Sequence, residues 1–237
     1  MATLSFVSDE DFDSAIKTLV DRILKADRDA MPNLVRNVRD PIPLLVEACI
    51  FGHDIATLNK NDEERSLASG VASAVGGFHQ SLLGSMPGWS VIEKGLDVRH
   101  DDRRTVAEIK NKHNTMNSSA RYRTVEKVED FVSRQSGGGR WVGYVVTVVP
   151  KKPGLPPVEI GRPPTKVYQI DGVQFYALAS GVEDALEQVY EQIPERIASY
   201  LEELDPSVFS DSPTFPLPTE TQRFCDELFR IAHISQR

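Results

Sequence analysis

Three ionisable residues in the segment GLDVRHDDRRTVAEIK, residues 95–110, have types and spacing that could do chemistry together. The alternation of apolar and polar residues predicts two strands joined by the polar turn HDDRR. Asp97 and Glu108 lie at equal distances from the middle of that turn, so they are expected to face each other across the strands. Side chains alternate along a strand, so Glu108 and Lys110 share one face while Ile109 points into apolar packing. The pattern therefore predicts that two carboxylates and an amine converge.

The chemistry expected of such a group is hydrolysis of a phosphodiester with a divalent metal. Two adjacent carboxylates raise each other's pKa unless a cation neutralises them. Mg²⁺ accepts carboxylate oxygens together with water and a substrate phosphate, which suits Asp97 and Glu108 in an open site. Lys110 can orient the attacking water and balance charge on the phosphate. The alternative reading is a solvent-exposed hairpin whose charged residues alternate by chance.

The charges of the chain are unevenly distributed. The net charge is −8, yet residues 94–152 hold 13 Lys or Arg against 7 Asp or Glu, and the rest of the chain holds 14 against 28. A basic middle with acidic flanks favours one surface for a polyanion, and a chance cluster of solvated charge is the alternative.

The elements that must position this segment follow from hydrophobic periodicity. Helices are predicted over residues 8–26, 43–51, 61–84, 117–135, 182–204 and 219–234. Strands are predicted as a pair joined by the polar turn within 89–110, over 141–149 and over 167–178, the last as a hairpin turning at Asp171 and Gly172. Pro194 is expected to kink or divide its helix. The helix 43–51 is expected to be buried, and Asn61 with Glu64 resembles a capping box that starts the next helix. The fold class is α/β, a mixed sheet flanked by helices.

Composition limits the class of protein further. No apolar run approaches the length of a membrane span, and MATLSFVSDEDF is not typical of a secretory leader, so a cytoplasmic location without a membrane partner is expected. Cys49 and Cys225 have apolar neighbours in predicted helices and are interpreted as buried thiols.

Longer motifs around the three ionisable residues carry a family resemblance. GLDV followed by AEIK resembles the PD-(D/E)XK nuclease superfamily. The segments GGFHQSLLG, AEIKNKHNTMNSSA and YQIDGVQFYAL together resemble type II restriction endonucleases that cut GGNCC or GGWCC, the group to which SinI and AvaII belong. The resemblance runs from about residue 62 to residue 201. It implies one nuclease domain over 1–237, with N-terminal helices over 8–60, a restriction-endonuclease-like core over about 62–201 and a C-terminal helical extension over 202–237.

The resemblance also assigns roles to residues. It implies Asp97 and Glu108 as ligands of Mg²⁺ and Lys110 as the catalytic lysine. A helical glutamate near the metal is common in the superfamily, and Glu64 is the candidate here, with helix capping as its alternative role. The chain departs from the superfamily pattern at Leu96, where proline is frequent.

Residues that follow the catalytic strand are expected to bind DNA. Lys, His and Asn side chains suit base edges in the major groove, and Lys or Arg suits guanine in particular. Lys112, His113, Asn114 and Asn117 are the candidates for base contacts, although the two asparagines also suit turns and helix caps. Phosphate contacts are assigned to Arg121, Arg123 and Lys127, and Lys151 and Lys152 suit either role.

The resulting hypothesis is a magnesium-dependent restriction endonuclease that acts as a homodimer on a nearly palindromic site. A cognate DNA methyltransferase is implied in the same host. Two alternatives stay open, a structure-specific repair or recombination nuclease of the same superfamily and a non-cleaving DNA-binding module. His79, beside the apolar face of its helix, is interpreted as a helix-packing residue.

Overall fold

The computed structural model describes residues 3–36, 38–114, 116–135, 140–209 and 213–234. Its helices are α1 (Asp9–Arg36), α2 (Pro41–Phe51), α3 (Ile55–Gly84), α4 (Ser118–Arg134), α5 (Gly172–Ser180), α6 (Ala185–Glu202) and α7 (Thr219–His233), with a short 3-10 helix at Pro206–Val208. Its strands are β1 (Trp89–Val91), β2 (Val98–His100), β3 (Thr105–Lys112), β4 (Val142–Val149), β5 (Val158–Glu159) and β6 (Lys166–Asp171). No helix in these ranges is long and apolar enough to cross a membrane.

The described strands form one mixed sheet in the order β1-β2-β3-β4-β6-β5. β1, β2 and β3 are antiparallel neighbours, whereas β3, β4 and β6 run parallel, and β5 is an antiparallel edge strand. The parallel strands are joined through α4 and through the proline-rich loop after β4. This arrangement confirms the α/β class with a mixed sheet and flanking helices.

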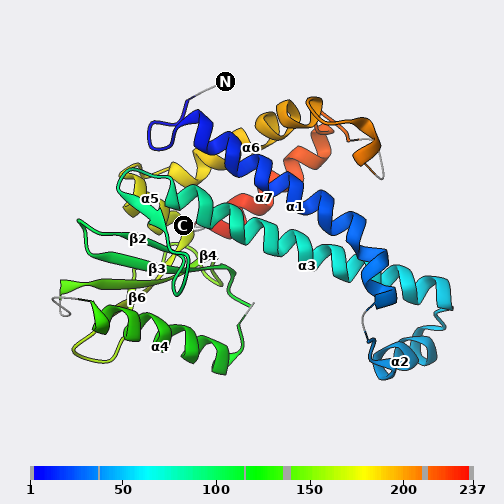
Figure 1. Ribbon diagram of the computed structural model, residues 1–237, viewed down its shortest axis with the longest axis horizontal. Helices are drawn as coiled ribbons and strands as arrows, with labels where there is room; N and C mark the ends of the chain where they lie inside the picture. Colours follow the sequence, from blue (N-terminus) through cyan, green and yellow to red (C-terminus); the bar gives the residue numbers. More distant parts are fainter. Residues whose placement is uncertain (1–2, 37, 115, 136–139, 210–212, 235–237) are drawn as a thin grey trace.

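Helices cover both faces of the sheet (Figure 1). One face packs against α1, α3, α5 and α6, and its core includes Val98, Ala107 and Ile109. The other face packs against α4 through a smaller cluster that includes Val106 and Val128. Successive residues of β3 therefore enter opposite cores, which is the alternation that the sequence predicts for a central strand.

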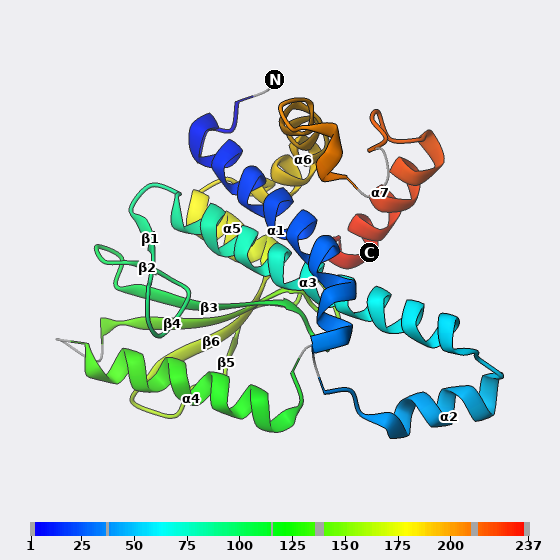
Figure 2. The same cartoon turned by 45° about the vertical axis from the view of Figure 1, so that its right-hand side comes forward.

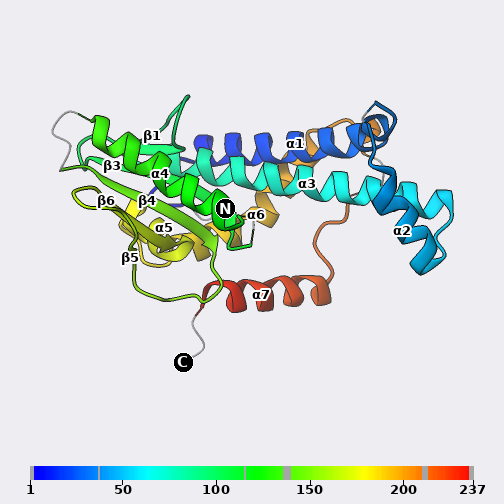
Figure 3. The same ribbon diagram turned by 90° about the horizontal axis from the view of Figure 1, so that it is seen from below.

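Two long helices extend beyond the sheet. α1 and α3 lie side by side, and their far ends carry α2 (Figures 1 and 3). Pro32 lies inside α1 and does not end it, so this helix is longer than the predicted 8–26. α3 begins at Ile55 with the Asp54 side chain accepting from the Thr57 N–H at 2.8 Å, so the predicted capping box at residues 61–64 was wrong.

Other predicted elements were also wrong. Asp171 and Gly172 do not turn a hairpin, because β6 ends at Asp171 and α5 begins at the next residue. α6 continues through Pro194, so this proline does not start a new helix, which was one of its two predicted effects. α2 has no buried residue, its Cys49 is exposed, and Cys225 is only partly covered. Tertiary packing overrode local preference in each case, since a segment such as 167–178 suits a strand or a helix by periodicity alone.

Candidate active site

The register of β2 and β3 brings Asp97 and Glu108 face to face. Val98 pairs with Ala107, and the Asp97 N–H donates to the Ala107 carbonyl at 3.0 Å. Asp97 therefore lies at the start of β2 directly opposite Glu108 in the middle of β3. The predicted hairpin and its turn at residues 101–104 are confirmed.

Both carboxylate oxygens of Glu108 are bound to lysine amines. The residue is 4% exposed. Lys110 Nζ donates to Oε1 at 2.9 Å, and Lys127 Nζ donates to Oε2 at 2.8 Å. A buried carboxylate needs such partners because desolvation makes an isolated charge costly. Lys110 comes from β3 itself, whereas Lys127 reaches across from α4.

Asp97 is held by different groups. The Gln80 amide on α3 donates to Oδ1, and the Ile109 N–H donates to Oδ2 at 2.6 Å. Burial raises the pKa of this carboxyl above its ordinary value; the Ile109 N–H opposes the rise and the charge of Glu108 adds to it. Gln80 of α3, Asp97 just before β2, three groups of β3 and Lys127 of α4 thus meet in the same small volume.

This donor set fits Mg²⁺. Two carboxylates provide hard oxygen ligands, and Mg²⁺ ordinarily keeps several waters and binds through one or two carboxylates plus phosphate. Within the described residues, no three His, Cys, Asp or Glu side chains gather as a possible metal site. Asp97 and Glu108 could thus hold a cation as two protein ligands, with its other positions left to water and a phosphate.

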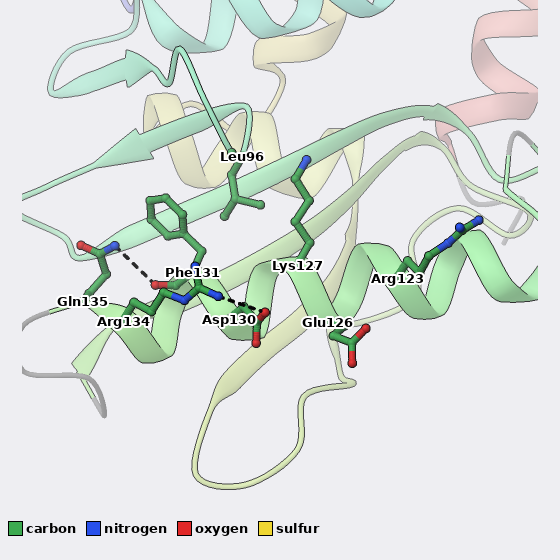
Figure 4. Close-up of a pocket in the computed structure, with 9 residues that line it drawn as sticks. Leu96, Arg123, Glu126, Lys127, Asp130, Phe131, Arg134 and Gln135 are labelled. Carbon is green, nitrogen blue, oxygen red and sulfur yellow. Dashed lines mark hydrogen bonds and ion pairs between the residues drawn. The ribbon is translucent and has the colours of Figure 1, made fainter.

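A cavity of about 540 Å³ lies along α4, and neither Asp97 nor Glu108 is among the residues that line it. Leu96, the neighbour of Asp97, lines it together with Lys127 (Figure 4). Arg123 and Arg134 add positive charge along the same side of α4, and Glu126 and Asp130 add negative charge. Lys127 extends from α4 toward the strands in this view, while Arg134 pairs with Asp130 at 3.5 Å. Lys127 is therefore the residue that joins this cavity to the Glu108 carboxylate.

The predicted DNA-binding residues divide into groups. Lys112 pairs in register with Val149, so Lys112 and His113 leave the same edge of the sheet as Lys151 and Lys152. The His113 N–H donates to the Val149 carbonyl at 3.0 Å, which fixes the two chain segments together. The side chains of Lys112, His113, Asn114, Lys151 and Lys152 are exposed. The structure therefore gathers these five at the carboxyl end of the parallel strands.

The remaining candidates lie on α4. Asn117 is the N-cap, accepting from the Ala120 N–H at 2.8 Å, so the capping role that its sequence context suggested is confirmed. Arg121 donates to Gln169 on β6 and lines a second cavity with Lys151 and Lys152. Arg123 is exposed and lines the cavity along α4.

Glu64 is not brought to the site. It lies on α3, 16 residues before Gln80, which is about 24 Å along the helix axis at the usual rise. Its side chain is 65% exposed and pairs with Lys60 at 3.9 Å. Within one chain it has no contact with Asp97 or Glu108, and Gln80 is the α3 residue that touches the carboxylates.

Two residues that contact the carboxylates, Gln80 and Lys127, were not predicted from the sequence to do so. Gln80 lies in the motif GGFHQ, one residue after His79, and helical spacing alone did not indicate which side of α3 meets β2. Lys127 was expected on a phosphate, but its contact with Glu108 depends on the packing of α4 over β3. His79 is buried, and its Nδ1 lies 2.7 Å from the Tyr176 hydroxyl, so it packs α3 against α5 as predicted.

A mixed sheet with helices on both faces, and with this site at the junction of β2 and β3, has the restriction-endonuclease-like fold. A sequence model of the Eco47II restriction endonuclease family matches residues 4–202, so the chain belongs to that family. The chain is 29% identical over 218 residues to the type II restriction enzyme Eco47II of Escherichia coli, which covers 86% of this chain and 90% of that one. It is also 26% identical over 220 residues to the type II restriction enzyme Sau96I of Staphylococcus aureus, with 84% and 81% covered.

Proposed function

We propose that this restriction endonuclease cuts double-stranded DNA with Mg²⁺ at a short G·C-rich, nearly palindromic site, GGNCC or GGWCC. The observation that carries the proposal is the placement of Asp97 opposite Glu108, with Lys110 on the same face of β3 and 2.9 Å from the Glu108 carboxylate. The family membership supports the type of enzyme. The resemblance of AEIKNKHNTMN to enzymes that cut GGNCC or GGWCC supports the proposed DNA recognition sequence.

Each residue has a part in the proposed hydrolysis. Asp97 and Glu108 would hold Mg²⁺, which supplies an activated water and neutralises charge on the phosphate. Lys110 orients the water and balances the developing negative charge. Gln80 and the Ile109 N–H keep the Asp97 carboxylate aimed at Glu108. The products would be a 5′-phosphate and a 3′-hydroxyl.

Lys127 has a part that differs from that of Lys110. Its side chain is 44% exposed, against 29% for Lys110, and it lines the cavity along α4. A cation bound between the carboxylates would neutralise Glu108, so Glu108 would no longer need two amines as partners. Lys127 has the more exposed amine and is therefore the lysine that can turn toward a phosphate. Lys127 would thus hold Glu108 in the free enzyme and contact the DNA backbone in the complex.

DNA is proposed to lie against the carboxyl end of β3 and β4. Lys112, His113 and Asn114 would reach base edges, with Lys112 the candidate for guanine. Lys151, Lys152, Arg121 and Arg123 would contact phosphates, and Asn117 would act through its helix cap. A homodimer would cut both strands, a DNA methyltransferase of the same host would protect the site, and both enzymes would work in the cytoplasm.

The test is digestion of a plasmid of known sequence with purified protein in Mg²⁺ and in EDTA, followed by sequencing of the ends. We expect discrete Mg²⁺-dependent fragments that end at GGNCC or GGWCC. Lys110→Ala should lower the cleavage rate by about 100-fold or more, as loss of a catalytic group does. Lys60→Ala, which removes an exposed lysine on α3, is the matched control and should cut like the wild type.

Other outcomes assign the site differently. Fragments without sequence preference, or preference for branched DNA, would indicate a repair or recombination nuclease. Binding without cleavage under every metal condition would indicate a DNA-binding module and would contradict the proposal.

A further inference from the structure

α2 is an apolar helix that lies at the surface of the molecule. Its apolar side chains Ile42, Leu45, Val46, Ile50 and Phe51 are between 46% and 67% exposed. Its partly covered positions are Leu44, Glu47 and Ala48, and Glu47 is the one charged residue of the helix. A surface helix of a monomer ordinarily presents charged side chains to water and its apolar side to the core. α2 instead presents apolar side chains to water and its one charged side chain to α3.

Ion pairs on the covered side hold α2 in this orientation. Glu47 pairs with Arg65 of α3, and Arg65 also pairs with Asp62 at 2.6 Å. Arg39, just before α2, pairs with the same Asp62 at 2.6 Å and donates to Asn59 at 2.8 Å. The Asp40 side chain caps α2 by accepting from the Ile42 N–H at 3.0 Å. These ion pairs and hydrogen bonds therefore hold α2 against α3 with its apolar side chains toward solvent.

The exposed apolar surface approaches the area that a stable contact needs. Ile55, at the start of α3, is 78% exposed and extends the stripe beyond the C-cap of α2. Together the six side chains expose on the order of 600 Å², which is the upper end of what a monomer leaves in one apolar patch. A standard interface buries about 800 Å² of each partner. An apolar patch with no charge of its own is also complementary to a second copy of itself.

α2 also lies on the side of the molecule that a symmetric DNA complex requires. In Figures 1 and 2, α2 and α4 both lie on the lower side of the molecule, α4 below the sheet and α2 at the far end of α3, with α6 on the upper side. α4 carries Lys127 to Glu108, so the active site opens on this same side. A two-fold axis near α2 would set two active sites toward one duplex.

α7 offers a second apolar stripe but a different surface. Phe224, Leu228 and Ile231 are exposed there. Charged residues share that exposed face, namely Glu220, Arg223, Glu227 and Arg230. The stripe of α7 is that of an ordinary amphipathic surface helix, and it does not lie beside α4.

We propose that α2 packs on α2 of a second copy and that this contact builds the dimer. The proposal deepens the proposed function, because a nearly palindromic site on duplex DNA is cut on both strands by a two-fold symmetric pair. We infer a second copy of this chain as the partner of α2 for three reasons. The apolar patch is complementary to itself, its area is close to that of a standard interface, and it lies on the same side of the molecule as α4.

The first test measures association without DNA or metal, so that it does not depend on cleavage. Sedimentation velocity of the wild type at micromolar concentration should show a particle of twice the 26.4 kDa chain mass. Leu45→Glu with Ile50→Glu should give monomers, with a dissociation constant raised about 100-fold or more. Phe224→Glu with Leu228→Glu on α7 is the matched control and should remain dimeric. Thermal unfolding followed by circular dichroism checks each fold, and Leu45→Ser with Ile50→Ser replaces a Glu variant that fails to fold.

A second test decides which surfaces meet. The Leu45→Glu variant mixed with a Leu45→Lys variant should form a heterodimer, since opposite charges then face each other across α2 and α2. Wild-type monomers, a dimeric α2 variant or a monomeric α7 control would each overturn the proposal. A wild-type dimer that cuts no DNA would contradict the proposed function alone, whereas sequence-specific cutting by a dimer that survives the α2 changes would contradict only the α2 contact.

Discussion

At the scale of single residues, the active site is defined by how one buried carboxylate is neutralised. Glu108 has a lysine on each oxygen, one from its own strand and one from α4. Asp97, by contrast, has only neutral donors, and burial raises its pKa. The two carboxylates therefore differ in environment although they face each other. Such unequal environments are common where a site is arranged for binding a cation rather than for stability.

Lys127→Ala tests the proposed division of work between the two lysines. Without this amine the variant should bind DNA about tenfold more weakly in Ca²⁺, which supplies the cation without Mg²⁺-dependent cleavage, because a phosphate contact is lost. Lys127→Arg should keep most of the affinity, since the charge is retained. Fluorescence anisotropy with a labelled duplex measures both. Equal affinities for the wild type and the Ala variant would show that Lys127 acts only on Glu108.

His79 gives a pH dependence to stability. Burial lowers its pKa to about 4 in the folded protein, while the unfolded chain takes up the proton near 6.5. The unfolded state thus binds more protons between these values, so the stability that neutral His79 provides is present above pH 6.5 and is lost as the pH falls toward 4. The free energy of unfolding should drop by roughly 3 kcal/mol over this range on account of His79.

The matched variant is His79→Gln, which keeps a partner for the Tyr176 hydroxyl but does not titrate. Urea unfolding measured between pH 4.5 and 7.5 should show that the free energy of unfolding falls less steeply with decreasing pH in this variant than in the wild type. Some slope should persist, because burial also lowers the pKa of His233. Identical slopes for the two proteins would show that His79 is not the group responsible.

At the scale of elements, the junction between β6 and α5 shows how a local motif is redirected. Asp171 and Gly172 suit a hairpin turn, yet the Asp171 side chain caps α5 by accepting from the Gln174 N–H at 2.8 Å. Its other oxygen accepts from the Gly154 N–H at 3.2 Å, which ties the proline-rich loop to the helix start. Asp is favoured both in turns and at N-caps, so the identity of the residue could not decide between them.

Asp171→Ala is expected to destabilise the protein by about 2 kcal/mol, because a cap is lost and two backbone N–H groups lose their acceptor. Chemical denaturation measures the change. Asp184→Ala is the control, since Asp184 precedes α6 without a side-chain cap bond, and its cost should be about 0.5 kcal/mol or less. Similar losses in the two variants would contradict the capping role.

At the scale of the whole molecule, charge is segregated onto the carboxyl edge of the parallel strands. Lys112 and the pair Lys151 and Lys152 leave the sheet there, beside the catalytic strand. A net charge of −8 for the chain does not prevent DNA binding when the basic residues are gathered in one place. The acidic helices lie elsewhere on the surface and would limit indiscriminate contacts.

Lys151→Ala with Lys152→Ala should reduce the salt dependence of DNA binding. The slope of log affinity against log salt concentration should become shallower by about 2, one for each lost phosphate contact. Anisotropy titrations at several salt concentrations, in Ca²⁺ or EDTA, give the slope. Lys166→Ala, at the amino end of β6 and thus on the opposite edge, should leave the slope unchanged. An unchanged slope in the double variant would place the DNA on another surface.

The sequence by itself determined the strand pair that brings Asp97 opposite Glu108 and the class of fold. Asp97, Glu108 and Lys110 are close in the chain, and strand alternation with a short turn fixes which of them share a face. The basic region, residues 94–152, could likewise be predicted from the sequence, because it follows from counting charged residues along the chain. Hairpin geometry is local, so no distant contact was needed to predict it.

Only the tertiary structure decided the contacts that cross between elements. Whether Gln80 or Glu64 of α3 approaches Asp97, and whether Lys127 reaches Glu108, depends on how α3 and α4 pack on the sheet. The exposure of α2 is of the same kind, because its apolar sequence is compatible with burial in its own chain or in a second one. Periodicity specifies that an apolar face must be covered, and packing alone specifies by what.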